Sequence, residues 1–292
     1  MFQGVYPAII TPFKKDESLD EKALRNLIRH LIKEGITGIV PCGTTGESPT
    51  LDYDEHMRVI EITVEEADGR IPVIAGTGSN STREAVLLSK KAAKIGADAL
   101  LLVSPYYNKP TQEGLYRHFC TVAKAVDLPV IIYNIKSRTG VNVETKTLFR
   151  IAAECPNIAG VKEASGDMEQ IKDVIKNAPD GFSVLSGDDS LTLELMKNGG
   201  HGVISVAANL IPGQMVRLVK TAAEKDFPSA KKLHDILSEL FSALFIETNP
   251  IPVKAALADR GMCEEIYRLP MCPMQKENRE YLLQTVKKIF SI

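Results

Sequence analysis

The sequence predicts an α/β protein that forms a (β/α)₈ TIM barrel followed by a small C-terminal helical domain. Eight short apolar runs recur along most of the chain, helical patterns fill the gaps between them, and the tail carries helical patterns only. Eight successive units favour a closed barrel, and a doubly wound open sheet is the alternative. We place the barrel at residues 1–226 and the helical domain at 227–292.

The predicted strands are apolar throughout instead of alternating, which is typical of parallel strands that are covered on both faces. They follow one another at about 20 to 35 residues, the length of one βα unit. The eight runs are 5–10, 38–41, 71–75, 99–103, 130–133, 158–161, 183–185 and 202–205.

The predicted helices carry recognisable start and stop signals. Residues 21–34 place leucines and isoleucines on one face and are followed by Gly35, and residues 83–94 end in the same way at Gly96. Asp52 precedes Glu55 by three residues, a capping box that opens a helix through residue 67. Helices are also expected after Asp167 and, in the tail, at 231–245, 251–260 and 278–290.

Composition excludes several classes of protein. The net charge is −2 with no long basic block, which argues against nucleic-acid binding, and no apolar run approaches the roughly 18 residues of a membrane span. The first 13 residues lack a basic leader, and the five cysteines are widely spaced and form no C-x-x-C pair, so we expect reduced thiols in a cytoplasmic protein. The histidines show no metal-ligand spacing, and no metal is expected.

Chemistry in such a barrel belongs at the carboxyl ends of the strands, and the run 158–161 ends on Lys162. Burial disfavours the charged ammonium and lowers a lysine pKa, and a neutral amine attacks carbonyls. Lys162 is therefore a candidate for Schiff-base chemistry. The alternative is a lysine that extends its ammonium to the surface from a strand end.

Other strand ends carry polar groups with two readings each. The run 43–47, Gly-Thr-Thr-Gly-Glu, could bind a carboxylate through its hydroxyls and backbone N–H groups. The alternative is a tight turn in which Thr44 and Glu47 cap each other. Tyr133 is a proton shuttle or an amphipathic tyrosine at the rim, and Arg138 is a carboxylate clamp or a surface ion-pair partner. Asp188 and Asp189 are interpreted as caps of the helix that follows them.

Taken in order, these strand ends resemble the dihydrodipicolinate synthase family of pyruvate-dependent class I aldolases, which also includes N-acetylneuraminate lyase. The resemblance covers the whole chain. Its most specific segments are 43–47, 74–78, 105–108, 112–115 and 249–254.

The resemblance implies that Lys162 forms an imine with pyruvate and that no cofactor is required. Tyr133, Thr44 and Tyr107 would form a proton relay, with Tyr107 supplied by a neighbouring subunit of a homotetramer built from two tight dimers. The implied reaction is the condensation of pyruvate with L-aspartate 4-semialdehyde in lysine and diaminopimelate biosynthesis. Neutral hydroxyl groups can move protons without opposing the positive charge of an iminium ion.

The resemblance also implies four substrate-binding positions. Thr45, with Thr44, would hold the pyruvate carboxylate, and Arg138 would bind the carboxylate of the semialdehyde. Gly187 and Ile204 would line the pocket through backbone carbonyls. One departure affects this set: the family usually has proline where this chain has Lys136, and we expect the loop that carries Arg138 to be looser as a result.

Some members of this family are inhibited by free lysine at a dimer interface, and the resemblance places that site at five positions of this chain. Glu84 could pair with the ammonium group of the effector, whereas Tyr53 stands where inhibited members often have histidine. The five positions are Ser48, His56, Asn80, Glu84 and Tyr106.

Two other functions remain open at this point. The first is a sister aldolase that acts on a sugar acid or a hydroxy-oxoglutarate, and the second is a non-catalytic barrel that senses small acids. Arg138 favours the semialdehyde over a neutral sugar acid, because a second carboxylate requires a cation. Lys162 together with the relay residues favours an enzyme over a sensor.

Overall fold

The computed structural model describes residues 1–291 and has a curled, all-parallel sheet at its centre. The strand order is β1-β7-β6-β5-β4-β3-β2, so β2 to β7 pair in chain order, the last strand pairs with the first, and β1 and β2 are the two edges. A doubly wound sheet would reverse its order in the middle, and this sheet does not. The strands are β1 (Gly4–Pro7), β2 (Ile74–Gly76), β3 (Ala99–Val103), β4 (Val130–Asn134), β5 (Ile158–Glu163), β6 (Ser183–Ser186) and β7 (Gly202–Ser205).

The predicted strand at 38–41 forms isolated bridges instead of a strand. Val40 bridges to Ala8, the residue after β1, and its N–H donates to the Pro7 carbonyl at 2.9 Å, while the Ile39 carbonyl accepts from the N–H of Ile74 on β2 at 2.9 Å. The ladder stays short because Pro41 has no N–H and Cys42 turns the backbone to a φ of 56°. The segment nevertheless lies between the two edge strands of the sheet.

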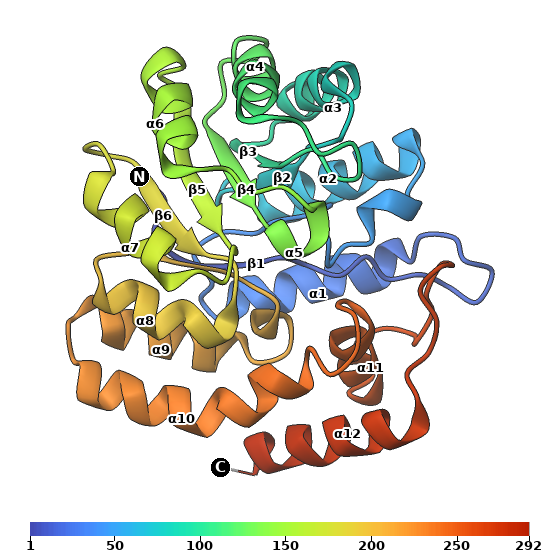
Figure 1. Ribbon diagram of the computed structural model, residues 1–292. Coiled ribbons are helices and arrows are strands. Elements are labelled where there is room, and N and C mark those ends of the chain that lie inside the picture. The colour runs from blue at the N-terminus through green and yellow to red at the C-terminus, as the bar shows by residue number, and fades with distance from the viewer. Residues whose placement is uncertain (292) are drawn as a thin grey trace.

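The helices alternate with the strands and lie around the outside of the sheet (Figure 1). Their predicted caps are confirmed: Asp52 and Glu55 form a capping box, and Asp167 caps α7. Through residue 223 the helices are α1 (Glu21–Lys33), α2 (Tyr53–Ala67), α3 (Thr82–Ile95), α4 (Gln112–Ala123), α5 (Lys136–Thr139), α6 (Thr145–Glu154), α7 (Met168–Asn177), α8 (Thr192–Lys197) and α9 (Pro212–Ala223).

The apolar runs are explained by two separate cores on the two faces of the sheet. On β3, Leu100 and Leu102 belong to the larger core between sheet and helices, whereas Ala99 and Leu101 belong to a smaller core on the inner face. Successive strand residues point to opposite faces, so burial on both requires continuous apolar sequence. The inner core also contains Val40, Tyr133 and Ile204.

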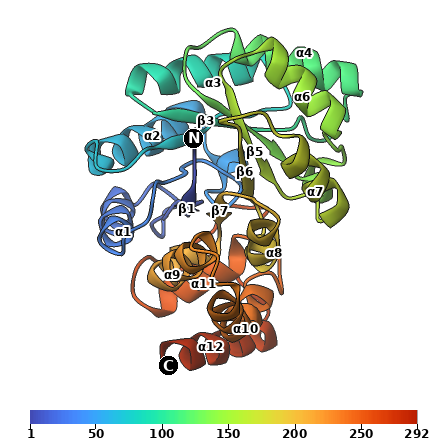
Figure 2. The same cartoon turned by 90° about the vertical axis from the view of Figure 1, so that its left-hand side faces the viewer.

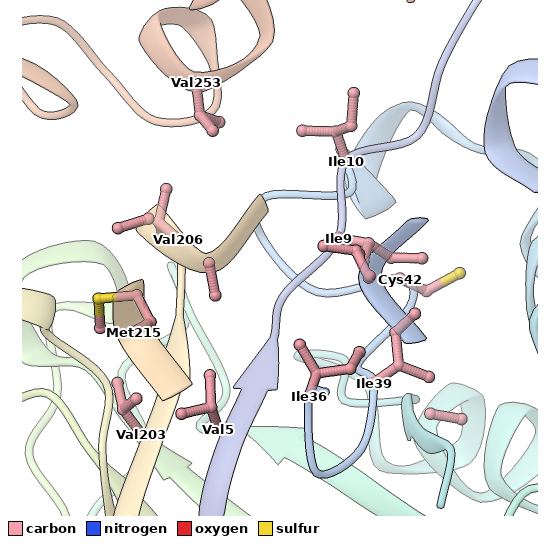
Figure 3. Close-up of a cluster of buried hydrophobic side chains, with 14 of the residues drawn as sticks. Val5, Ile9, Ile10, Ile36, Ile39, Cys42, Val203, Val206, Met215 and Val253 are labelled. Carbon is pink, nitrogen blue, oxygen red and sulfur yellow. The ribbon is translucent and has the colours of Figure 1, made fainter. Parts of the chain in front are cut away.

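Figure 3 shows part of the larger core beside β1 and β7. Val5 and Val203 come from these paired strands and lie near Met215 of α9. Val206 and Val253 continue the same core away from the sheet towards the C-terminal helices, and both are buried. The core therefore joins the sheet to the helical tail.

Three further helices, α10 (Phe227–Ala243), α11 (Ile251–Asp259) and α12 (Lys276–Phe290), lie together on one side of the sheet (Figures 1 and 2). Helix α10 packs against α9 and α12, and α11 packs against α12. The predicted tail helices are confirmed, although α10 begins four residues earlier than expected because Asp226 caps it and Pro228 suits its first turn. Within residues 1–291, no helix is both long and apolar enough to cross a membrane.

Candidate active site

Lys162 and Tyr133 lie side by side at the carboxyl ends of β5 and β4. The two residues are partners in the parallel register, so their side chains leave the same face of the sheet. The Lys162 Nζ lies 4.1 Å from the centroid of the Tyr133 ring, and only 5% of Lys162 is exposed. The alternative prediction, that Lys162 extends its ammonium group to the surface, is therefore wrong.

Burial sets the protonation of Lys162. It lowers the pKa of the amine from 10.5 to about 7, an effect that the negative charge of Asp189 opposes and the positive charge of Arg138 reinforces. Close to neutral pH, a large fraction of this lysine is the uncharged nucleophile. The site thus meets the first requirement of imine chemistry.

Tyr133 and Thr44 line one small cavity of about 40 Å³ with Gly43 and Cys42. Burial raises the pKa of Tyr133 from 10.0 to about 12, although Thr44 acts to lower the pKa of this hydroxyl. The phenol therefore stays protonated at neutral pH and can pass a proton only in concert with its neighbours. The structure brings Lys162, Tyr133 and Thr44 together, as the sequence predicts.

Gly187 lies directly against the Lys162 side chain. A Cβ at this position would lie 2.9 Å from Lys162 Cε and 2.7 Å from the Ala164 Cβ, so only glycine leaves the lysine in place. Its N–H donates to the Glu163 carbonyl at 2.8 Å. Ile204, on β7, is buried in the inner core together with Tyr133.

Thr45 and Arg138 are joined through Asn249, a residue to which sequence reasoning gave no role. The Asn249 side-chain amide donates to Thr45 Oγ1 at 3.0 Å, and its backbone carbonyl accepts from Arg138 Nη2 at 3.0 Å. Asn249 is buried, and its Oδ1 has no partner among the described residues. The only signal in the sequence for Asn249 was that segment 249–254 resembles the family. Its contacts reach residues more than a hundred positions away, and such contacts leave no local pattern.

The loop that carries Arg138 is an ordered helical turn, α5, with Lys136 as its first residue. The N–H groups of Arg138 and Thr139 both donate to the Ile135 carbonyl, at 3.2 and 3.0 Å, and Gly140 donates to Lys136 at 2.9 Å. A first helical residue needs no partner for its own N–H, so lysine fits where proline would.

Tyr107 is the predicted site residue that this chain does not bring to Lys162. Its side chain is 89% exposed, in a loop where its backbone has a φ of 70°. A large aromatic side chain held in the left-handed region and left in solvent is unusual.

The sequence predicts that both Asp188 and Asp189 cap the helix that follows them. The prediction is confirmed for Asp188 and is wrong for Asp189. Asp188 caps the short helix η2 (Asp189–Leu191) that follows it. Asp189 is buried and instead accepts from the Ser205 hydroxyl at 2.5 Å and from the N–H groups of Val206 and Ala207 at 3.1 and 2.9 Å. Burial raises the pKa of this carboxyl to about 6. Tertiary packing at the end of β7 outweighs the local capping preference of Asp189.

A second cavity, of about 350 Å³, contains four of the five residues predicted for effector binding: Ser48, His56, Glu84 and Tyr106. The fifth, Asn80, donates from its side chain to the Tyr106 carbonyl at 3.2 Å. Glu84 accepts from the hydroxyls of Ser79 and Tyr53, and these bonds hold the pKa of its carboxyl below the usual range.

Histidine, cysteine and carboxylate side chains of residues 1–291 do not gather in any group of three or more that could hold a metal ion. The charged groups that influence the pKa of Lys162 are Asp189 and Arg138. The chemistry of the site is that of an amine, hydroxyls, a carboxylate and a guanidinium.

The family model described as "Dihydrodipicolinate synthetase family" matches residues 1–289 of this chain. The chain belongs to this family. A 4-hydroxy-tetrahydrodipicolinate synthase of Thermodesulfovibrio yellowstonii is 55% identical over 98% of both chains.

Solved structures of the dihydrodipicolinate synthetase family share the whole architecture. The crystal structure of dihydrodipicolinate synthase from Aquifex aeolicus is 53% identical, with a TM-score of 0.97 over 98% of both chains. The 4-hydroxy-tetrahydrodipicolinate synthase of Methylacidiphilum fumariolicum SolV is 48% identical, with a TM-score of 0.98 over 100% of this chain and 97% of that one.

Proposed function

We propose that this chain is a lyase of the class I aldolase type, which condenses pyruvate with L-aspartate 4-semialdehyde through a Schiff base. The reaction is that of a 4-hydroxy-tetrahydrodipicolinate synthase, in the biosynthesis of lysine and diaminopimelate, and it needs no external cofactor. Relatives that are 50–55% identical over nearly the whole chain carry this name. The observation that carries the proposal is the buried Lys162, whose pKa is about 7, against the ring of Tyr133.

The first step is attack of the neutral Lys162 amine on C2 of pyruvate. The C2 oxygen takes up protons and leaves as water, and a carbon–nitrogen double bond remains as the iminium ion. Thr44 and Thr45 hold the pyruvate carboxylate, and the absence of a side chain at Gly187 leaves room for the lysine. The iminium draws electrons from the methyl group and makes its protons acidic.

The second step joins the two substrates. Loss of a methyl proton gives an enamine, whose terminal carbon forms a bond to the aldehyde carbon, while the aldehyde oxygen gains a proton through Tyr133, Thr44 and Tyr107. Arg138 holds the carboxylate at the far end of the semialdehyde. The amine of that substrate then attacks the imine carbon, which closes the ring and releases Lys162.

Borohydride reduction in the presence of pyruvate tests this proposal. The reductant fixes the imine, and peptide mass mapping is expected to find one pyruvate adduct, on Lys162. The variant Lys162→Met should form none, and the exposed-lysine control Lys172→Met should form it normally. A wild-type chain without an adduct on Lys162 contradicts the mechanism.

We also propose that the segment 38–41 is the eighth strand that closes the barrel. Its backbone bonds to β1 and β2 and the place of Val40 in the inner core support this. Residues 1–226 then form the barrel and 227–292 the helical domain of a cytoplasmic enzyme. A homotetramer with two tight dimers would give the exposed Tyr107 a partner.

The cavity of Ser48, His56, Glu84 and Tyr106, with Asn80 bonded to Tyr106, is proposed as a site for free lysine. Its Glu84 carboxylate suits an ammonium group, although the Tyr53 hydroxyl already donates to Glu84 at 2.5 Å. Saturating L-lysine should slow the enzyme and raise its melting temperature, and Glu84→Gln should remove both effects. If lysine changes neither quantity in the wild type, this site is not used.

A further inference from the structure

A buried ion pair anchors the Gly43–Glu47 loop to the C-terminal helices. Lys254 of α11 has no exposed surface, and its Nζ donates to the carboxylate of Glu47, which is 3% exposed. The same Nζ donates to the Ile266 carbonyl at 3.0 Å and lies 4.4 Å from the centroid of the Phe13 ring. The ammonium is thus enclosed by groups that suit a positive charge.

The loop is attached at two further points. The Thr11 hydroxyl donates to the Gly46 carbonyl at 2.7 Å, and the Asn249 amide donates to the Thr45 hydroxyl at 3.0 Å. Glu47 ends the loop in the left-handed region, with a φ of 52°, and its N–H donates to the Thr44 carbonyl at 3.1 Å. The attachments are therefore at residues 45 to 47, directly after Thr44, and Thr45 is itself one of them.

An ion pair in this position is not explained by stability alone. Removing two charges from water is expensive, and apolar residues of similar volume often replace a buried pair without loss of stability. Neither side chain takes part in the steps described above. A charged bond does fix distance and direction more strictly than an apolar contact does.

We propose that Glu47 and Lys254 are positioning residues for pyruvate. The pair holds the end of the loop so that the Thr44 and Thr45 hydroxyls stay where the carboxylate of pyruvate binds, and α11 thereby controls the affinity of the pyruvate subsite. This inference rests on the function proposed above and adds to it a contribution from the C-terminal helices.

The double variant Glu47→Met with Lys254→Met tests the pair without leaving an unpaired charge. We expect a folded enzyme whose KM for pyruvate is raised about tenfold, the loss expected of one charged hydrogen bond. Its KM for the semialdehyde and its kcat at saturating pyruvate should be unchanged. A purely structural role would instead reduce kcat and melting temperature and leave the pyruvate KM as it was.

Tyr267→Phe is the matched control. It removes a bond from the Tyr267 hydroxyl to the Ile251 carbonyl at the start of α11, keeps the ring beside Lys254, and should leave the pyruvate KM unchanged. If that double variant does not fold, Glu47→Gln with Lys254→Met gives the same test, since it also removes both charges and nearly keeps both volumes.

A folded variant with the wild-type pyruvate KM overturns the positioning role. The wild-type borohydride adduct on Lys162 separates this result from a failure of the proposed function. If the wild type forms that adduct, only the role of the pair is in question, and if it forms none, the function and this inference fall together.

Discussion

Lys162 owes its reactivity to the balance of three nearby influences on its amine. Burial lowers the pKa, Asp189 raises it, and Arg138 lowers it. The apolar inner core supplies the burial, and β6 with the segment after it supplies the carboxylate. A nucleophile close to half-neutral at pH 7 is therefore a property of the surroundings and not of the lysine alone.

Removing the charge of Asp189 should make Lys162 easier to deprotonate. In the wild type, the rate of borohydride-trapped imine formation should rise as pH increases through about 7, where the lysine loses its proton. Asp189→Asn removes an influence that raises the lysine pKa, so this rise should move to lower pH. Asp180→Asn, an exposed control, should leave the profile unchanged, and an unshifted profile in Asp189→Asn would contradict this account.

Gly187→Ala should disable the lysine without touching any polar group. The new Cβ would lie 2.9 Å from Lys162 Cε, and the lysine must move to relieve the clash. A misplacement of this size is expected to slow imine formation on the order of 100-fold. Gly213→Ala in α9 is the comparison, because its Cβ meets only the end of the flexible Glu34 side chain, and single-turnover trapping with pyruvate measures both.

Elements with strong local signals were predictable from the sequence, and elements fixed by tertiary contacts were not. The capping box of α2 and the continuous apolar run of β3 can each be recognised from a few consecutive residues. The short bridges of segment 38–41, the role of Asp189 and the contacts of Asn249 depend on partners far away in the chain. The site residues were placed by family resemblance, since Thr45 or Arg138 alone has an equally good structural reading.

Lys136→Pro restores the usual family residue at the start of α5 and should not lower activity or stability. Lys136 is the first residue of the turn, and Ile135 before it is not helical, with a φ of −140° and a ψ of 83°, so proline at 136 meets no helical residue before it. We expect unchanged activity and a gain of about 0.4–1 kcal/mol in the free energy of unfolding, measured by urea denaturation. Ser137→Pro should lower stability, because it disfavours the helical conformation of Lys136. Loss of activity in Lys136→Pro would show that the lysine itself is required.

At the scale of the whole molecule, one chain brings together most of the proposed site residues but not Tyr107. Lys162, Tyr133 and Thr44 meet within the chain, whereas Tyr107 extends into solvent. In the proposed relay, a second subunit would supply this hydroxyl.

Subunit mixing tests whether Tyr107 acts across an interface. Lys162→Met and Tyr107→Phe should each be nearly inactive, but hybrid assemblies should regain activity, because one of their sites has an intact lysine and receives an intact Tyr107. Mixing Lys162→Met with Tyr133→Phe is the control and should give no recovery, since both residues belong to the same chain's site. Equal results from the two mixtures would argue against a shared site.

Asn249 has a consequence for any attempt to redesign this enzyme. Its side chain donates to Thr45 and its backbone carbonyl accepts from Arg138, so one residue connects the two positions proposed to bind the two substrates. Replacing Arg138 to admit an uncharged aldehyde removes the donor to the Asn249 carbonyl. Because the Asn249 side chain donates to Thr45, this change should also disturb the proposed binding of the pyruvate carboxylate. Selection for a new acceptor would therefore work best when positions 45, 138 and 249 vary together.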